Sequence, residues 1–513
     1  MSIRRTIHII FLLLILALSS CQANLPTPPE STPTISPPAA GPAHPTGLPT
    51  SPSPLSPTPY SPSPSSPTLA PSPENLPNTQ YTLSAVLDYG RHHLAVEQKI
   101  DYTNKSGEEL ADLLLIVEPG RYPGVFQLAG LAWEDGSPVA GHAWDGAWLN
   151  IPLASPLQPG ESLSLSLAYE LSLPSPQPSP DVRPIPFGYT ARQTNLVDWY
   201  PFIPPYIPGQ GWLAHPAGYF GEHLAYEAAD FEVSIRLANA RTDLVIAASA
   251  LGEVDGDWQR YRFDTARNFA WSVSPDYQVL EEKVGAVTVR GYAFPAHAAA
   301  GEAALETTAQ ALALYSDLFG PYPHGSLSVV EADFLDGMEF DGLYFLSNAF
   351  YNLYSGGVDD YLTAIAAHET AHQWWYGLVG NDQALEPWLD EALSTYSERL
   401  FYERLYPQAL DWWWAYRVNL YEPHGWVDGS IYNPAGFWVY RDAIYLNGAV
   451  FLEALRELVG DEIFFAFLKD YVDQNSHRLA TGEDFFTLLR QHTQADLDPL
   501  IQQYFSNQAL LSQ

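Results

Sequence analysis

The sequence contains one group of side chains whose types and spacing suit metal chemistry. His368 and His372 are four residues apart in the motif His-Glu-Thr-Ala-His, and Glu391 follows after eighteen further residues. On a helix, residues four apart leave the same face, so both imidazoles can bind one ion. Imidazole and carboxylate suit zinc, and three such ligands leave a fourth position open for water or substrate. The pattern therefore predicts a catalytic zinc site.

Glu369 lies inside the motif, one step round the helix from His368. It is too far off the axis of the pair to be a good ligand, but it can take a proton from a water molecule that the metal activates. Zinc lowers the pKa of such a water to roughly 7. The alternative is an amphipathic helix with two surface histidines. The charges of Asp359 and Asp360 at the helix start, and an apolar stripe beside the motif, favour the metal site.

At these residues the sequence resembles the aminopeptidase N family of gluzincin zinc metallopeptidases. The stretches HETAHQWWYGLVG and WLDEALSTYSE match that family's patterns HExxHQWFG and WLNEGFATYxE without a gap. The resemblance implies an aminopeptidase acting on peptides with one zinc ion per chain. It assigns the zinc ligands to His368, His372 and Glu391. It makes Glu369 the general base and Glu398 the carboxylate that orients a ligand imidazole.

Two further positions carry the same resemblance. Residues 337–339, Gly-Met-Glu, are similar to the family's G-A-M-E-N strand, whose glutamate binds the α-amino group of the substrate and here corresponds to Glu339. Asp336 and Phe340 depart from that pattern. Tyr445 matches the family's Y-x-K-G-A segment and is expected to stabilise the oxyanion, since a phenol donates more strongly as the oxygen gains charge. A solvated strand glutamate and a core tyrosine are the alternatives.

The elements that must position these residues fall in the second half, residues 288–513. Apolar periodicity predicts a helix over 301–319, a strand over 326–330, and helices over 450–459, 461–474, 482–491 and 496–505. The resemblance implies a thermolysin-like α+β and helical catalytic domain. It covers residues 79–513, so the large C-terminal helical-repeat domain of many family members is not expected and the cleft should be open to longer peptides.

Residues 79–287 show strand patterns instead. Apolar and polar residues alternate over 81–87, 94–102, 162–173 and 231–237, with Asp-Gly and Pro-Gly turns between strands. These patterns predict an antiparallel β domain, and the resemblance implies the family's saddle-like N-terminal domain. The Pro- and aromatic-rich segment 174–228 interrupts it. The resemblance lets this segment offer Gln193 to the substrate amine, whereas Trp199, Tyr200 and Trp212 would otherwise only close the contact between domains.

The N-terminal region has a different composition. Residues 1–20 combine Arg4 and Arg5 with a short apolar core, which predicts a secretory signal peptide. The ending Leu-Ser-Ser-Cys resembles a bacterial lipobox, so Cys21, the one cysteine of the chain, is expected to carry lipid on the outside of a cell membrane. An ordinary signal peptide is the alternative. Residues 21–78 are rich in Pro, Ser and Thr and predict an extended disordered tether.

The formal net charge of −36, from 59 acidic and 23 basic residues, restricts the partners. Such a surface repels nucleic-acid phosphates and anionic lipid headgroups, so we expect no nucleic-acid partner and a membrane contact only through lipid at Cys21. Two rival functions stay open: an endopeptidase, if the strand around Glu339 no longer binds the amine, and a peptide-binding relative without turnover. The sequence gives neither the side-chain preference nor the oligomeric state.

Overall fold

The computed structural model describes residues 76–175, 186–239, 243–433 and 435–511, which belong to one compact unit. The predicted signal peptide, Cys21 and nearly all of the predicted tether lie outside the described residues. Within the described ranges, no helix is both long and apolar enough to cross a membrane.

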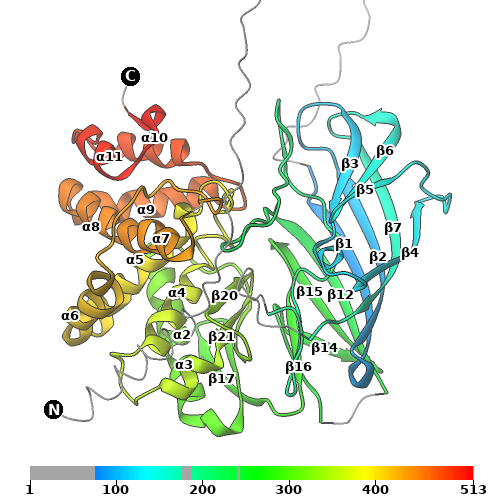
Figure 1. Ribbon diagram of the computed structural model, residues 1–513, viewed down its shortest axis with the longest axis horizontal. Helices are drawn as coiled ribbons and strands as arrows, with labels where there is room; N and C mark the ends of the chain where they lie inside the picture. The colour runs from blue at the N-terminus through cyan, green and yellow to red at the C-terminus, as the bar shows by residue number, and fades with distance from the viewer. Residues whose placement is uncertain (1–75, 176–185, 240–242, 434, 512–513) are drawn as a thin grey trace, which may run out of the picture. The chain divides into compact units, whose positions relative to one another are not determined.

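A seven-stranded sheet dominates the first half, residues 79–274, which we call the β half (Figure 1). Its order is β14-β15-β12-β1-β2-β7-β4. The strands are β1 (Thr79–Asp88), β2 (His93–Thr103), β4 (Phe126–Trp133), β7 (Ser162–Ser172), β12 (Ala229–Ala238), β14 (Gly252–Asp255) and β15 (Trp258–Ala266). Every second side chain of β1 is buried, which explains the alternation in its sequence.

One strand pair departs from the expected antiparallel arrangement. β1 and β12 pair in parallel, whereas the other neighbours in this sheet run antiparallel. No hairpin connects β1 to β12, so their relative direction is not set by a turn, and sequence alternation carries no information about it. The predicted antiparallel β domain is present, with this parallel pair as its exception in the sheet.

Three smaller sheets complete the β half. They are β3 (Leu110–Ile116), β6 (Trp148–Leu157) and β5 (Ala143–Asp145); β13 (Val245–Ala248), β16 (Trp271–Ser274), β9 (Thr194–Leu196) and β8 (Gly188–Tyr189); and β10 (Tyr206–Ile207) with β11 (Gly211–Trp212). The aromatic segment after β9 packs inside this half. Trp199 and Tyr200 are buried, and the Trp199 indole donates a hydrogen bond to the Phe269 carbonyl at 2.9 Å.

A second, five-stranded sheet has the order β17-β18-β19-β21-β20 and begins the catalytic half. Its strands are β17 (Gln278–Val284), β18 (Val287–Ala293), β19 (Ser326–Ala332), β20 (Gly337–Phe340) and β21 (Leu343–Ser347). The expected domain boundary at 287/288 therefore falls at the end of the β17–β18 turn, inside a hairpin of this sheet. The sequence patterns did not indicate which sheet residues 278–293 join. β20 lies at the edge of the sheet.

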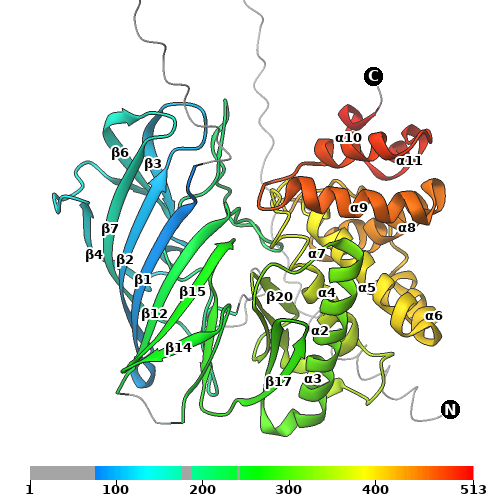
Figure 2. The same cartoon turned by 180° about the vertical axis from the view of Figure 1, so that it is seen from behind.

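Helices cover one face of this sheet and extend beyond it (Figure 2). They are α2 (Ala298–Phe319), α3 (Asn348–Leu353), α4 (Tyr361–Ala371), α5 (Trp388–Leu405), α6 (Leu410–Trp412), α7 (Phe437–Arg441), α8 (Asn447–Val459), α9 (Asp461–Asn475), α10 (Gly482–His492) and α11 (Asp498–Tyr504). Asp360 caps α4 by accepting from the Leu362 amide at 2.9 Å, and Thr481 with Asp484 forms a capping box on α10.

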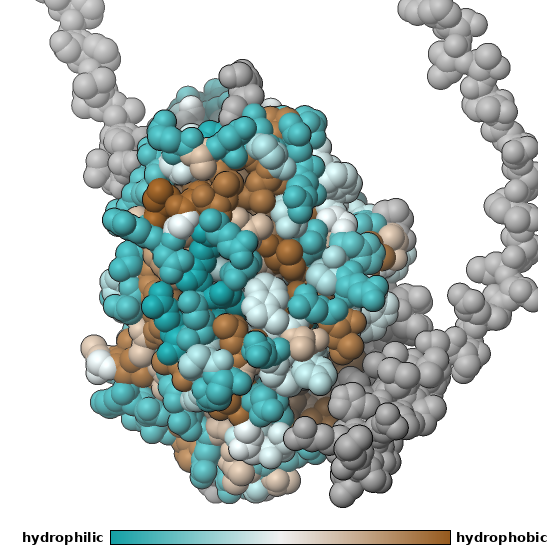
Figure 3. Space-filling model, turned by 90° about the vertical axis from the view of Figure 1, so that its left-hand side faces the viewer, coloured by the Kyte–Doolittle hydropathy of each residue, from teal (hydrophilic) through white to brown (hydrophobic). Residues whose placement is uncertain are grey.

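The two helices that carry the motif residues lie in the core of the catalytic half. Residues 362–371 of α4 are all buried, and so are residues 388–402 of α5. The opposite face of the five-stranded sheet packs on the β half, through side chains such as Phe340 and Phe345. Figure 3 shows the outer side of the helices, where hydrophilic residues surround several separate hydrophobic patches. The motif is therefore held between packed layers rather than on an exposed amphipathic helix.

Candidate active site

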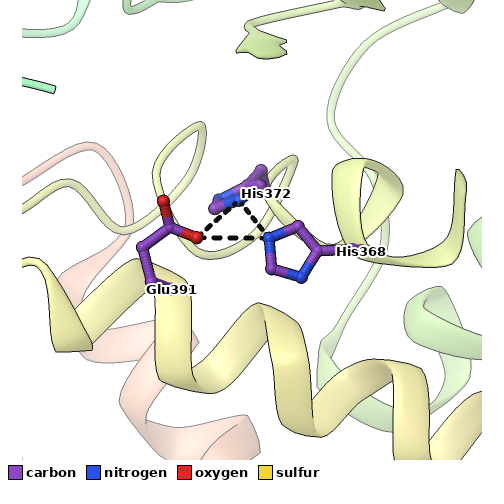
Figure 4. A group of neighbouring side chains, drawn as sticks. All are labelled: His368, His372 and Glu391. Carbon is purple, nitrogen blue, oxygen red and sulfur yellow. Dashed lines mark hydrogen bonds and ion pairs between the residues drawn. The ribbon is translucent and has the colours of Figure 1, made fainter. Parts of the chain in front are cut away.

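His368, His372 and Glu391 converge on one point (Figure 4). The Nε2 atoms of the two histidines are 3.1 Å apart, and Glu391 Oε2 lies 3.2 Å from the first and 3.5 Å from the second. Zinc bonds of about 2.0–2.1 Å at tetrahedral angles place neighbouring ligand atoms about 3.3 Å apart. All three side chains are at most 5% exposed. The structure thus brings the three expected ligands to zinc-binding distances.

The far nitrogen of each imidazole has its own partner. His368 Nδ1 lies 2.9 Å from Glu398 Oε1, and His372 Nδ1 lies 3.0 Å from the Trp375 carbonyl oxygen. A hydrogen bond at Nδ1 fixes the tautomer in which Nε2 offers its lone pair to a metal. Glu398 therefore occupies the place that the sequence resemblance gave it.

Two residues that sequence reasoning missed hold Glu398. The Arg417 guanidinium donates to both of its carboxylate oxygens, at 2.8 and 2.9 Å, and the Trp413 indole donates at 2.8 Å. Both residues come from a π-helical turn, Trp413–Val418, which follows α6. Such turns often occur at functional sites. A buried carboxylate that supports a ligand needs a cation, but no spacing in the sequence connects Arg417 to the motif.

Protonation of the triad follows from this packing. Burial lowers the pKa of a histidine, but hydrogen bonds to Glu391 and Glu398 outweigh it and raise the pKa of His368 to about 9. At His372, Glu339 and Glu391 likewise overcome burial and raise its pKa well above the ordinary value. The same two imidazoles hold the pKa of Glu391 far below its ordinary value against the effect of burial. A cation therefore competes with protons for this cluster.

Glu369 faces the same point from α4. It is 4% exposed, and its Oε2 atom is buried without a hydrogen-bond partner. Burial raises the pKa of Glu369 to about 8, the two imidazoles oppose the rise, and Glu339 adds to it. A cation in the triad would lower this pKa again. An unsatisfied buried carboxylate oxygen beside the triad is placed to accept a proton from water or a hydrogen bond from substrate.

The edge strand β20 comes very close to Glu369. A Cβ atom on Gly337 would lie 1.9 Å from Glu369 Oε1, so a residue with a side chain cannot occupy that position without moving the carboxylate. The preceding residue, Asp336, has φ of 79°, in the left-handed region that favours glycine. Asp336 thus adopts a backbone conformation that the family's glycine would take easily.

Glu339 follows on the same strand and points into the site. Ligand atoms of Glu339, Glu369 and His372 all lie within 4.8 Å of one another. Behind it, the Gln383 side-chain amide donates to Glu339 Oε1 at 3.1 Å and to Asp390 Oδ2 at 2.8 Å. Burial and the adjacent Glu391 raise the pKa of Asp390 well above its ordinary value. Sequence reasoning missed Gln383 and Asp390, although Asp390 directly precedes a predicted ligand.

Tyr445 reaches the site from a second π-helical turn, Asp442–Leu446. Its hydroxyl donates a hydrogen bond to Glu391 Oε1, and its ring stacks on His368 with centroids 6.0 Å apart. The structure therefore brings Tyr445 next to the triad. Gln193 differs: it is fully buried, and its side chain hydrogen bonds to the Tyr277 hydroxyl, the Glu331 carbonyl and the Asp333 amide. It packs the β half against β19 rather than facing the triad.

Comparisons relate this chain to known peptidases. Residues 303–504 match the Peptidase family M1 domain. The catalytic half of this chain is thus similar to the peptidase family M1 domain. Family M1 and the donor set of two imidazoles and one carboxylate both indicate zinc as the cofactor.

Named relatives agree with the family. Aminopeptidase N from Lactobacillus helveticus is 26% identical over 299 residues, which are 53% of this chain and 35% of that protein. Probable aminopeptidase 2 from Sulfurisphaera tokodaii is 23% identical over 247 residues, 45% of this chain and 31% of that protein. The chain thus spans about a third of the length of these family M1 relatives.

A solved structure shares the fold of both halves. The M1 zinc metallopeptidase from Deinococcus radiodurans superposes with a TM-score of 0.60 at 21% identity, covering 83% of this chain and 92% of that protein. A mutant of that protein has been determined with the substrate Tyr-Ser-Ala bound. The likeness confirms the predicted fold class, a β-rich N-terminal domain followed by a helical catalytic domain.

Proposed function

We propose that the protein is a zinc-dependent aminopeptidase that hydrolyses the bond after the first residue of a peptide. The position of Glu339 carries this proposal, because its carboxylate lies within 4.8 Å of Glu369 and His372 and is buried. A buried carboxylate at the reacting centre favours a cation, and the α-amino group of a peptide supplies one. The peptide would then be bound by its first residue.

The chain supplies the groups that the reaction needs. Zinc held by His368, His372 and Glu391 supplies a Lewis acid that polarises the scissile carbonyl and acidifies water. Glu369 takes a proton from the attacking water and passes it to the leaving amine. The Tyr445 hydroxyl donates a hydrogen bond to the carbonyl oxygen as that oxygen gains charge. β20 lies at the edge of its sheet, where an extended peptide can align beside it.

Paired substrates test the proposal. The purified protein is given aminoacyl fluorogenic amides with a free α-amine and the same amides with that amine acetylated. An aminopeptidase cleaves the free-amine forms and leaves the acetylated forms intact. Cleavage of acetylated substrates at comparable rates would favour the zinc endopeptidase. No cleavage of either form, nor of longer peptides, with zinc bound would favour a peptide-binding relative without turnover.

We also propose that the protein acts outside the cytoplasm, anchored by lipid at Cys21. The apolar segment of residues 1–20 and the Leu-Ser-Ser-Cys ending support this location. Labelling of cells with a radioactive fatty acid tests it. The protein should carry the label, and Cys21→Ser should not. A labelled Cys21→Ser protein would rule out this anchor.

A further inference from the structure

A cavity of about 70 Å³ opens beside Glu339. Its walls come from the turn Glu118–Arg121 of the β half, from the neighbouring residues 217–226, and from β20 of the catalytic half. The proposed function requires that Glu339 holds the α-amino group of the peptide. The side chain of the peptide's first residue then lies within reach of this cavity. The chemistry of the cavity then decides which first residues the enzyme accepts.

The cavity suits an unbranched side chain of middle length. A group the size of a water molecule takes roughly 10–15 Å³ of such a cavity, so the cavity holds about five or six groups of that size. A lysine or norleucine side chain has about that many non-hydrogen atoms. Phe220, Leu224 and Met338 give the wall an apolar part against which a hydrocarbon stem can pack.

The polar part of the wall is acidic. The charged side chains are the carboxylates Glu118, Asp198, Glu222 and Glu339, against the basic Arg121 and His223. Glu118 is already paired, because Arg121 donates to its Oε1 and His223 Nε2 lies 3.3 Å from its Oε2. Asp198 accepts a hydrogen bond from the Tyr226 hydroxyl at 2.5 Å, and the ion pairs of the described residues do not include it.

Asp198 has an unusual backbone conformation. It has φ of 47°, and the next residue, Trp199, is fully buried. A non-glycine residue in this region of φ is uncommon and often marks a functional position. Burial raises the pKa of Asp198 to about 7; the Tyr226 hydroxyl and Arg121 oppose the rise, and Glu118 and Glu339 add to it. The same carboxylates that disfavour a charge on Asp198 would attract a cation into the cavity.

We infer that the cavity beside Glu339 binds a basic first residue, lysine above all, with Asp198 as the counter-ion of its ammonium group. This inference rests on the proposed function for the position of the α-amine. It adds the class of peptide: those that begin with a long, positively charged side chain.

Lysyl and norleucyl fluorogenic amides test the inference, because norleucine has the four-carbon stem of lysine and lacks its terminal ammonium group. We expect kcat/KM for the lysyl amide to exceed that for the norleucyl amide by about tenfold or more, as one charged hydrogen bond contributes. Asp198→Asn should reduce this ratio by about tenfold and change the norleucyl rate less than about threefold. Asparagine tolerates the left-handed backbone and still accepts from Tyr226.

Asp264→Asn is the matched control, because Asp264 is exposed on β15 and pairs with Arg262. It should leave the ratio unchanged. A wild-type ratio near one, or a ratio that Asp198→Asn does not lower, would overturn the inference while leaving an aminopeptidase in place.

A binding measurement separates this inference from the proposed function. Titration calorimetry of L-lysine and L-norleucine with the zinc-loaded protein needs no turnover. About tenfold tighter binding of L-lysine, lost in Asp198→Asn, supports the basic pocket even if no amide is cleaved. Equal binding of the two amino acids to the wild-type protein overturns it.

Discussion

At the scale of single residues, buried partners stand behind two of the groups that would contact zinc or substrate. Glu398 and Arg417 stand behind His368, and Gln383 stands behind Glu339. Such partners restrict the rotamers of the side chains in front of them, so the site is formed before substrate arrives. Substitution of a partner should therefore change the properties of the side chain that it holds.

Gln383→Met tests the partner of Glu339. Methionine keeps the length of the side chain but removes the amide donor, so we expect KM for free-amine substrates to rise about five- to tenfold, the effect of one hydrogen bond, with little change in kcat. In a Glu339→Ala background the same substitution should have no further effect on KM. Steady-state kinetics of the four proteins, with equal zinc content, would show this. An equal effect of Gln383→Met on KM in both backgrounds would contradict the role of Gln383 as the partner of Glu339.

The pH dependence of zinc binding tests the protonation of the triad. The metal-free pKa of His368 is raised to about 9, so in the metal-free protein a proton must leave before zinc binds. Affinity should therefore rise with pH from about 6.5 and keep rising to about 9, whereas ordinary imidazoles with pKa of about 6.5 would level off earlier. Competition with a chelator over this range measures it. A plateau reached by about pH 7.5 would contradict the raised pKa.

At the scale of elements, the site depends on how closely the edge strand β20 and helix α4 approach. Gly337 of β20 lies against the Glu369 carboxylate of α4. The strand also carries Glu339, so one element sets both the base and the amine anchor. The approach is possible because position 337 has no side chain.

Gly337→Ala should therefore impair catalysis more than folding. The added methyl group meets Glu369 Oε1 at 1.9 Å and must push that carboxylate away from its position. The family's G-A-M-E-N pattern has alanine at this position, so we expect the flexible carboxylate to shift and kcat to fall by about tenfold or less, short of the roughly hundredfold or more that loss of a general base costs, while zinc content and the unfolding transition stay close to wild type. Ser347→Ala, at the end of the neighbouring β21, serves as a comparison. Normal kcat in Gly337→Ala would contradict the close approach.

Sequence periodicity predicted the elements better than their arrangement. The helices that contain residues 301–319, 450–459, 461–474 and 482–491 are present, because each buries one face against a core. The boundary expected at 287/288 separated β17 from β18, because no motif in the sequence marks their pairing. Motif spacing located the triad and Glu369. It could not locate Arg417, Gln383 or Asp198, which reach the site through the tertiary fold alone.

At the scale of the whole described unit, Arg267 connects the two halves. It follows β15 and is 2% exposed. Its guanidinium donates to the carbonyl oxygens of Tyr226, Gly377, Leu378 and Arg478, at 2.8 to 3.1 Å. Burial lowers the pKa of Arg267 to about 10 and Asp341 opposes the fall, so the side chain is charged at neutral pH. The β half thus holds the backbone five residues beyond His372.

Arg267→Met should destabilise the folded protein strongly. It leaves the buried carbonyl oxygens of Tyr226 and Gly377 without a donor, whereas the other two carbonyl oxygens keep a backbone donor. Each buried group left unsatisfied costs about 1–3 kcal/mol. Urea unfolding followed by tryptophan fluorescence measures the free energy of unfolding. Arg262→Met is the matched control: its side chain is exposed on β15, the strand that precedes Arg267, and should change stability by only about 0.5 kcal/mol. Equal effects of the two substitutions would contradict the connecting role of Arg267.

The most direct test of the whole account is turnover and zinc content of Glu369→Gln beside wild type. Glutamine preserves the shape of the side chain but cannot accept a proton from water. Metal analysis should find about one zinc per chain in both proteins, since Glu369 lies outside the triad. Turnover of a free-amine aminoacyl amide should fall by about a hundred- to ten-thousand-fold. A zinc-loaded Glu369→Gln protein with near-normal turnover would contradict the proposed mechanism.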